Sequence, residues 1–474
     1  MSGVENSTPL VAVMLLGWIP AVLVVFGLMR SRRRAVIAAF LFAWLFLPIA
    51  EYEIKLFPEF NKTTATNIGV LCAVLLFDSE RLFRFRPKWF DLPVVVLCFC
   101  PVISSLTNGL GAYNGFSDAF KEVVVWGVPY FVGRLYLDDV HAFRELAIAI
   151  FISGLVYVPL CLYEIRFSPQ LHRVVYGYHQ HDFAQVLRWG GYRPMVFLDH
   201  GLLVGMWMTA ASICGFWLWL TKSLRQILGV PVGVLLAVLM GTTVLCKSTL
   251  AVLLLFVGVC ALLIVRYFRR GWPITAIAAV SVAYVFLRAL GLWQGSELVD
   301  AADRMFGGPR AQSLETRIEN ENLLAERARQ QAVFGWSGWG RSRIKDERGR
   351  DISITDSLWI IKFGTNGLVG MTAFLAVLGL PVVLARRRVP PAFWLHPAAA
   401  PTLAVTTVLA LWMVDLSLNA GIVPLFVAMA GGLVGIKQVV AAQPAPVTPA
   451  RSSHPDLVSR RRDAVRGRTT QSDP

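Results

Sequence analysis

The sequence is poor in charged residues. Only 16% of its 474 residues are Asp, Glu, Lys or Arg, whereas 56% are hydrophobic and the mean hydropathy is +0.58. A soluble domain carries about 25% charged residues and about 45–50% apolar ones. The apolar residues fall in blocks close to the ~20 residues that a membrane-spanning helix needs. The shortage of charge therefore argues against an ordinary soluble protein and predicts an all-α, polytopic integral membrane protein.

Several motifs of known chemistry are also missing. The sequence has no Gly-x4-Gly-Lys-Ser/Thr phosphate loop, no Asp-x-Asp pair and no His-Glu-x-x-His zinc motif. Its seven cysteines lie in or beside apolar blocks, which indicates buried thiols and no disulfide framework. His172, His179 and His181 cluster without a further ligand at a defined spacing, so no metal site and no cofactor are predicted.

The apolar blocks predict a bundle of about 12–13 transmembrane helices. The blocks cover roughly residues 10–28, 35–50, 64–77, 92–107, 120–137, 145–165, 194–220, 227–245, 248–265, 272–291, 357–385, 399–418 and 421–436. The blocks at 35–50 and 64–77 are short, and a re-entrant pair is an alternative for them. We expect four parts: helices 1–10 in 1–291, a partly helical external loop in 292–355, the last helices in 356–440, and a tail in 441–474.

The charge balance is basic, with a net charge of +15. Lys and Arg accumulate in the cytoplasmic loops of membrane proteins, which explains most of this excess without nucleic acid. Basic clusters follow the first, third, seventh, ninth and eleventh blocks, so these clusters define the predicted cytoplasmic side. The tail is Pro-rich and then Arg-rich, as expected of a disordered cytoplasmic segment near anionic lipid.

The predicted external loop 292–355 breaks this charge rule, because it contains ten Lys and Arg residues on the side where such residues are scarce. The spacing of Thr316 and Glu319 indicates a capping box, and the run from Arg317 to Val333 favours a helix. One interpretation is a solvated surface on which Arg317 pairs with Glu321 one turn away. The other is a binding site for an anion, because Arg matches phosphate oxygens with a rigid fork.

Three further cations fall at the same predicted depth as this loop. Arg193 opens the seventh block, Lys247 lies between the eighth and ninth, and Arg288 lies near the outer end of the tenth. Charged side chains at helix ends often extend to the interface, and this explains any one of them alone. A charge retained in the apolar zone is costly and indicates function. Three cations beside a basic loop favour the diphosphate of a lipid carrier as ligand.

The order of several segments resembles the superfamily of O-antigen ligases and O-antigen polymerases. The resemblance covers about residues 185–375 and rests on degenerate motifs. These are Tyr192-Arg193-Pro194-Met195-Val196-Phe197-Leu198-Asp199-His200-Gly201, Cys246-Lys247-Ser248, the stretch from Arg317 to the turn Phe334-Gly335-Trp336-Ser337-Gly338-Trp339-Gly340, Thr355-Asp356-Ser357-Leu358-Trp359, and Gly364-Thr365-Asn366-Gly367-Leu368-Val369-Gly370. Family members often carry His where this sequence has Asp356, and an Asp can also accept a proton from a sugar hydroxyl.

The resemblance implies a metal-independent, inverting glycosyltransferase of the bacterial inner membrane whose active site faces the periplasm. The donor would be a polyprenyl-diphosphate-linked glycan, such as one on undecaprenyl diphosphate, and the acceptor a glycan or lipid-linked glycan. Membrane lipids and other polysaccharide assembly proteins are the further partners. Expected roles are diphosphate binding by Arg193, Lys247, Arg288 and Arg317, catalysis by Asp356 and Arg317 with His200 and Asp199 as weaker bases, and sugar binding by Tyr192, Trp336 and Trp339.

Alternatives remain for several of these assignments. Asp356 is also a good helix N-cap, and His200 can instead hydrogen-bond within the bundle. The aromatic residues also fit the Trp and Tyr belt of any membrane protein. The sequence does not separate a polymerase of exopolysaccharide or O-antigen from a ligase to lipid A core or protein. A flippase or transporter of anionic glycolipid is the competing class, for which Glu164 and Asp415 are candidate intramembrane charges. A receptor is disfavoured because no cytoplasmic signalling domain is recognisable.

Overall fold

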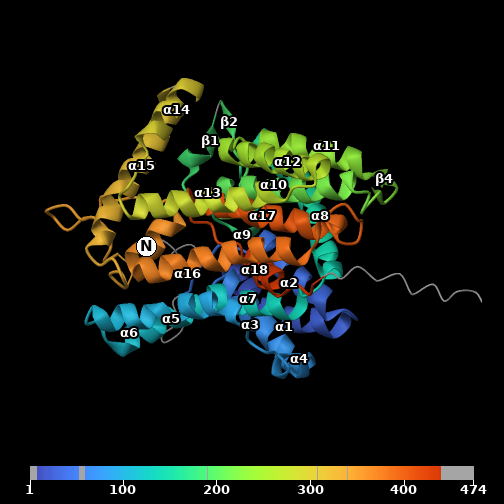
Figure 1. Ribbon diagram of the computed structural model, residues 1–474, viewed down its shortest axis with the longest axis horizontal. Coiled ribbons are helices and arrows are strands. Elements are labelled where there is room, and N and C mark those ends of the chain that lie inside the picture. The colour runs from blue at the N-terminus through green and yellow to red at the C-terminus, as the bar shows by residue number, and fades with distance from the viewer. Residues whose placement is uncertain (1–7, 53–58, 189, 307, 339, 439–474) are drawn as a thin grey trace, which may run out of the picture. The chain divides into compact units, whose positions relative to one another are not determined.

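The computed structural model describes residues 8–52, 59–188, 190–306, 308–338 and 340–438. Within these ranges the chain is almost entirely helical, and its strands form two short hairpins (Figure 1). This confirms the predicted all-α class. The residues up to Lys437 form one compact unit.

Seven helices in the described part of the chain are long and apolar enough to cross a membrane. They are α1 (Pro9–Leu28), α5 (Leu92–Thr107) with its leading 3-10 turn η1 (Trp89–Asp91), α8 (Val140–Phe167), α10 (Gly201–Leu220), α12 (Thr249–Phe268), α13 (Trp272–Ala289) and α16 (Leu358–Arg388). Four further apolar helices are shorter, namely α3 (Lys62–Phe77), α11 (Val232–Leu245), α17 (Ala400–Leu416) and α18 (Pro424–Gly435). The predicted count of 12–13 spans is not confirmed, because several apolar blocks form helices well short of the ~20 residues that span a bilayer.

The remaining elements are short or interrupted. The block at 120–137 is one such case, because it contains the end of α6 (Gly111–Glu122), a π-helical turn η2 (Val123–Gly127) and α7 (Val128–Tyr136). The others are α2 (Arg32–Phe46), α4 (Ser79–Phe83), α9 (Leu171–Tyr176), η3 (Phe183–Val186), β1 (Leu187–Arg188), β2 (Gly191–Tyr192), β3 (Gln226–Ile227), β4 (Val230–Pro231) and η4 (Pro391–Phe393). Strands β1 and β2 pair Leu187 with Tyr192 and Arg188 with Gly191 in antiparallel register.

Helices α10, α17 and α18 form the centre of the bundle and are buried on nearly every side (Figure 1). A helix that is apolar all round belongs in such a position. Small residues allow the closest approach, between α7 and α18. A Cβ atom on Gly133 would lie 1.9 Å from the Ala428 carbonyl oxygen, and one on Gly431 would lie 2.0 Å from that of Tyr130. Glycine is therefore required at both positions.

The loop between α13 and α16 contains two helices, α14 (Ser296–Phe306) and α15 (Gly308–Arg329), and α15 packs against α13 and α16. The predicted helix is present, but its bounds were wrong. Thr316 lies inside α15, where its hydroxyl donates to the Gln312 carbonyl at 2.9 Å, so it does not form a capping box with Glu319. The helix ends at Arg329, before the predicted end at Val333.

The segment after α15 docks onto a break in α16. Gly367 has non-helical backbone angles (φ 66°, ψ −165°), which frees neighbouring backbone groups. Trp336 N–H donates to the Gly364 carbonyl at 2.8 Å, and Leu368 N–H donates to the Ala332 carbonyl at 2.7 Å. Buried backbone polar groups need such partners. The two glycine-containing motifs of the sequence therefore interlock and hold the end of the loop against the bundle.

Candidate functional site

The segment between β2 and α10 contains Arg193 and is fixed by a buried carboxylate. Glu164, near the end of α8, accepts hydrogen bonds from Met195 N–H at 2.8 Å and Val196 N–H at 2.7 Å. Val196 has φ 53°, an unfavourable conformation for a β-branched residue. Strained residues of this kind persist only where their surroundings hold them, and they concentrate at functional sites.

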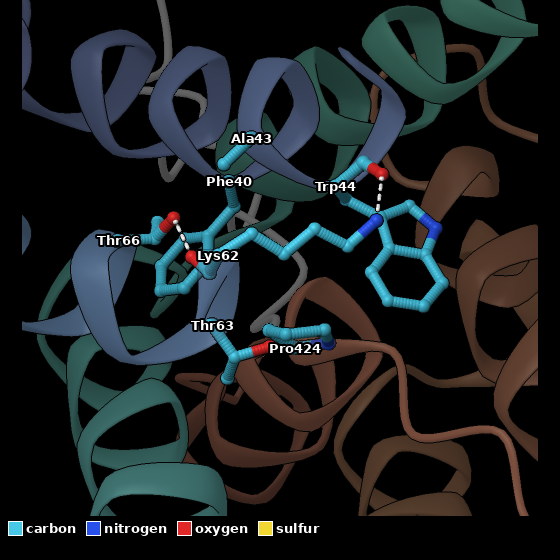
Figure 2. A pocket seen from close by; sticks show the side chains of 7 residues that line it. All are labelled: Phe40, Ala43, Trp44, Lys62, Thr63, Thr66 and Pro424. Atoms are coloured by element: carbon cyan, nitrogen blue, oxygen red, sulfur yellow. Dashed lines mark hydrogen bonds between the residues drawn. The ribbon is translucent and has the colours of Figure 1, made fainter. Parts of the chain in front are cut away.

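A buried lysine, Lys62, contacts the same segment from another side, and Figure 2 shows this lysine beside Trp44. The Lys62 ammonium donates to the Trp44 carbonyl at 3.0 Å and to the Phe197 carbonyl at 3.5 Å, and it lies 4.7 Å from the centre of the Trp44 ring. The cavity beside it, of about 10 Å³, is close to the minimum for one water molecule. Lys62 therefore serves to position the backbone of the segment that begins at Arg193.

Arg193 is linked to the turn at Lys247. Its Nη2 donates to the Lys247 carbonyl at 3.1 Å, and the Lys247 ammonium donates to the Arg188 carbonyl at 3.2 Å. The predicted turn Cys246-Lys247-Ser248 between two helices is confirmed, since α11 ends before it and Ser248 is the N-cap of α12. Lys247 has φ 54°, a second strained non-glycine residue in this region.

Arg317 and Asp356 form an ion pair between α15 and the start of α16. Arg317 Nε lies 3.1 Å from Asp356 Oδ2, and Arg317 Nη1 donates to the Leu418 carbonyl at 3.4 Å. Asp356 is not the cap of α16, because the N-cap position belongs to Ser357. The predicted pairing of Arg317 with Glu321 was wrong, although Arg343 and Arg350 of the same loop do pair with the loop carboxylates Asp351 and Asp346. Both side chains of the Arg317–Asp356 pair remain about one-third exposed, so a ligand can reach them.

The cations in this region repel one another. Burial and the nearby charges of Arg188 and Arg317 lower the pKa of Arg193 to about 10. Only 8% of Arg193 is exposed, and its buried Nε has no hydrogen-bond partner. Among the described residues, no carboxylate lies within 4.0 Å of the charged groups of Arg188, Arg193 or Lys247. We call Arg188, Arg193, Lys247 and Arg317 the cation cluster. An anion bound there would relieve the repulsion.

His200 caps a helix. Its Nδ1 accepts a hydrogen bond from Leu202 N–H at 3.0 Å, and its Nε2 lies 3.2 Å from Gln185 Oε1. These contacts assign a neutral ring protonated on Nε2. Burial, His181 and the nearby arginines lower the pKa of His200 to about 3. Both ring nitrogens are occupied, so the structure gives His200 the alternative role of a hydrogen-bonded residue within the bundle. Asp199 lies beside it, and burial raises its pKa.

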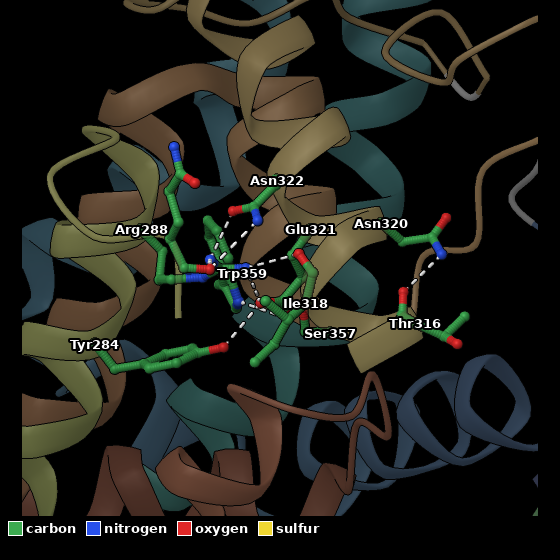
Figure 3. A network of polar contacts seen from close by, with 10 residues as sticks. Tyr284, Arg288, Thr316, Ile318, Asn320, Glu321, Asn322, Ser357 and Trp359 are labelled. Carbon is green, nitrogen blue, oxygen red and sulfur yellow. Dashed lines mark hydrogen bonds and ion pairs between the residues drawn. The ribbon is translucent and has the colours of Figure 1, made fainter. Parts of the chain in front are cut away.

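Arg288 belongs to a separate network of polar contacts around Glu321 (Figure 3). Its guanidinium is 3.1 Å from Glu321 Oε2 and donates to Asn322 Oδ1 at 2.6 Å. It also donates to the Ile318 carbonyl at 3.0 Å. Only 2% of Arg288 is exposed. Its contacts connect α13 to α15, so the structure gives Arg288 a partner within the fold and does not bring it to the other cations predicted to bind a diphosphate.

The predicted sugar-binding aromatic residues have different surroundings. The Trp336 indole N–H donates to the Arg327 carbonyl at 2.9 Å, and the Arg327 guanidinium lies 3.6 Å from the ring centre. Arg327 lies about 15 Å along α15 from Arg317, so Trp336 is remote from the cluster and covered on one face. Tyr192, half-buried on β2, directly precedes Arg193. Trp339 lies outside the described residues.

The clustered histidines have separate structural roles. His172 Nδ1 is 2.9 Å from the Tyr178 carbonyl, and its Nε2 accepts from Ile49 N–H at 3.2 Å. His179 lies 3.0 Å from the Pro169 carbonyl. In the part of the chain that the structure describes, no group of three His, Cys, Asp or Glu residues is arranged to hold a metal ion.

Two residues of the candidate site were missed by sequence reasoning. Arg188 belongs to the cation cluster, and the Gly190-Gly191 pair after it was a signal for a hairpin that would return the chain to Arg193. Lys62 carried no such signal, because its contacts come from residues distant in sequence. Asp415 was noted only as an intramembrane charge, and the structure brings it near Arg317 while Asn419 donates to its carboxylate at 2.7 Å.

Comparison of the chain with protein-family models, with curated proteins and with solved structures finds no match.

Proposed function

We propose that the protein is a membrane glycosyltransferase that uses a polyprenyl-diphosphate-linked oligosaccharide as donor. The observation that carries the proposal is Arg193: a buried arginine with no carboxylate partner among the described residues, an unpaired Nε, and a pKa lowered first by burial and then by neighbouring cations. Such a residue is unfavourable in a resting protein unless a ligand supplies the missing negative charge. A diphosphate matches the fork geometry of Arg193 and Arg317 and the charge of Lys247.

The reaction requires a base, an acceptor and a leaving group. The acceptor hydroxyl attacks the anomeric carbon as the bond from that carbon to the diphosphate oxygen breaks. The lipid diphosphate leaves with the electron pair, and the hydroxyl proton passes to Asp356. Fixed guanidinium groups at Arg193 and Arg317 stabilise the charge that grows on the leaving group, without reorganisation at the moment of reaction.

The ion pair of Arg317 with Asp356 fits both roles. In the resting protein Arg317 neutralises Asp356 across 3.1 Å. A bound diphosphate would share Arg317, which leaves the carboxylate oxygens freer to accept a hydrogen bond from the acceptor hydroxyl. We place the site at the periplasmic face of a bacterial inner membrane and favour a polymerase of surface polysaccharide over a ligase to lipid A core or protein.

A second candidate is a transporter of anionic glycolipid. Lys362 of α16, six residues after Asp356, forms a partly buried ion pair with Glu122 of α6, and α16 breaks at Gly367. Interrupted helices and intramembrane charge pairs are features of transporters. Such a protein would need the cation cluster but no general base, so Asp356 separates the two candidates.

The test is reconstitution of the purified protein with polyprenyl-diphosphate-linked oligosaccharide in the presence of EDTA. Glycan length and free polyprenyl diphosphate are followed for the wild type, Arg317→Ala and Asp356→Asn. The matched control is Arg350→Ala, because Arg350 belongs to the same basic loop but is exposed and pairs with Asp346.

Longer glycans that form in EDTA, and disappear in both site variants but not in the control, would support a metal-independent polymerase. Release of lipid diphosphate only with a separate acceptor would indicate a ligase. Movement of the lipid across the bilayer without any glycosyl transfer would replace the transferase proposal with the transporter.

A further inference from the structure

Glu321 is the most highly connected carboxylate of the external segment (Figure 3). Its Oε2 accepts hydrogen bonds from the Tyr284 hydroxyl at 2.8 Å and from Arg288 Nη2 at 3.1 Å. Its Oε1 accepts from the Ser357 hydroxyl at 2.7 Å and from the Trp359 indole N–H at 3.3 Å. One side chain of α15 thus joins α13 to the start of α16.

The ion pair of Glu321 with Arg288 is costly to bury. Glu321 is 5% exposed and Arg288 is 2% exposed. Replacement of a buried ion pair by apolar groups is often neutral or stabilising, so stability alone is a weak explanation for it. Buried charges that make specific hydrogen bonds are better known for fixing one register among several. The register in question here is that of α15 against α13 and α16.

The register matters because the contact of Glu321 with Ser357 lies next to the proposed catalytic pair on both of the segments that it connects. Arg317 precedes Glu321 by one helical turn, and Asp356 directly precedes Ser357. Two adjacent contacts therefore connect these segments in the same register: Arg317 with Asp356, and Glu321 with Ser357. Asn320 Oδ1 adds a third link by accepting a hydrogen bond from Ile354 N–H at 2.9 Å.

We propose that Glu321 is a positioning residue for the transferase reaction: with Arg288 as its counter-ion, it holds Arg317 and Asp356 at the separation that catalysis needs. This rests on the proposed function. Glu321 does not touch the donor, because its oxygens are occupied by four donors and its side chain is buried. Displacement of reacting groups by about 1 Å can lower a rate about 100-fold.

The test uses two variants and one matched control. Glu321→Gln leaves Arg288 buried without its counter-ion, so this variant can fail through misfolding alone. Arg288→Met combined with Glu321→Gln removes both charges, while the amide introduced at position 321 retains one oxygen for Ser357 and Trp359 and offers an N–H to the Tyr284 hydroxyl. The control is Glu326→Gln, the same chemical change at an exposed position of α15.

For the double variant we expect a kcat about 10–100-fold lower than that of the wild type, and a KM for the lipid-linked donor within about threefold of it. The donor would still be held by Arg193 and Lys247, which lie on other elements. Hydrogen exchange should speed up in residues 317–322 and 354–359 while the melting temperature stays close to that of the wild type. Glu326→Gln should match the wild type in every measurement.

A double variant with wild-type kcat, or a fall in kcat with no change in exchange at 317–322, would overturn the positioning role. If the wild type itself transfers no sugar, the proposed function fails separately. Unchanged exchange at both segments in the double variant would then overturn the structural part of the inference as well.

Discussion

Basic residues lie near both ends of α8, but those near its start have carboxylate partners and Arg193, near its other end, has none among the described residues. At its start, Arg33 lies 2.6 Å from Asp139, Lys437 lies 2.8 Å from Asp138, and Arg134 lies 2.8 Å from Asp91. Glu164, near its other end, fixes the segment of Arg193, which has no such partner among the described residues. The helix is 28 residues long, so about 40 Å separates the two regions.

On the proposed function, the difference separates charge that stabilises the fold from charge that binds a ligand. Where cations face aspartates, as Arg33, Lys437 and Arg134 do, the protein's own side chains neutralise their charge. Where cations face one another, as Arg193 faces Arg188 and Arg317, the resting protein retains repulsion that a bound anion relieves. The number of basic residues is therefore not enough to distinguish the two cases. The positions of the carboxylates relative to the cations distinguish them.

The largest expected effect is on stability, at the paired end. Arg134→Met leaves Asp91 buried without its partner, because the two side chains are only 8% and 1% exposed. Breaking a buried pair from one side costs about 3–5 kcal/mol. Thermal unfolding should show this loss, and Arg34→Met, whose exposed ion pair with Glu145 contributes ~0–1 kcal/mol, is the matched control. An equal melting temperature for the two variants would contradict the distinction between the end of α8 where cations are paired with carboxylates and the end near Arg193.

The next effect is on activity, at the unpaired end. Arg193→Met should lower kcat/KM for the lipid-linked donor about 10²–10³-fold, the usual loss when one fixed donor to a developing charge is removed. Its melting temperature should not fall and should rise slightly, because repulsion from Arg188 and Arg317 is relieved. Steady-state kinetics and thermal unfolding of the same preparation check both parts. Full activity, or unfolding of the kind expected for Arg134→Met, would contradict the comparison.

The smallest effect is a pH dependence of stability at His200. The folded state lowers the pKa of His200 to about 3, whereas the ordinary value is 6.5. The unfolded chain therefore binds more protons below pH 6.5, and stability present above that pH is lost as the pH falls. Asn is also a good helix cap and does not titrate. We expect His200→Asn to match the wild type at pH 8 and to lose less melting temperature by pH 5; parallel pH profiles would refute this account of His200.

Local patterns allowed part of the fold and site to be predicted. The shortage of charge predicted the helical class, and the Cys246-Lys247-Ser248 turn was correctly placed between two helices. Arg193 and Lys247 were singled out because a cation beside apolar residues is conspicuous in any sequence, and Arg317 because it lies in a strongly basic loop and in a motif that resembles a known superfamily. These features depend on neighbours along the chain, which a sequence displays directly.

The remaining features depend on contacts between distant residues. In the sequence, Arg288 and Arg193 have similar surroundings. The structure shows that Glu321 is the partner of Arg288, and no residue near Arg288 in the sequence indicates this carboxylate. The same holds for Glu164, which stabilises the strained backbone at Val196 from 32 residues away. The Thr316 capping box failed because α15 begins at Gly308, which places Thr316 inside the helix.

The central claim is that the cation cluster binds a diphosphate, and equilibrium binding tests it most directly. Farnesyl diphosphate would be titrated in EDTA into the wild type, Arg193→Met and Arg34→Met, with inorganic pyrophosphate as competitor. The account predicts saturable binding by the wild type and Arg34→Met that pyrophosphate reverses, and an affinity at least about tenfold weaker for Arg193→Met, since a hydrogen bond to a charged group is worth about 1.5–3 kcal/mol. Equal affinity in all three proteins would contradict it.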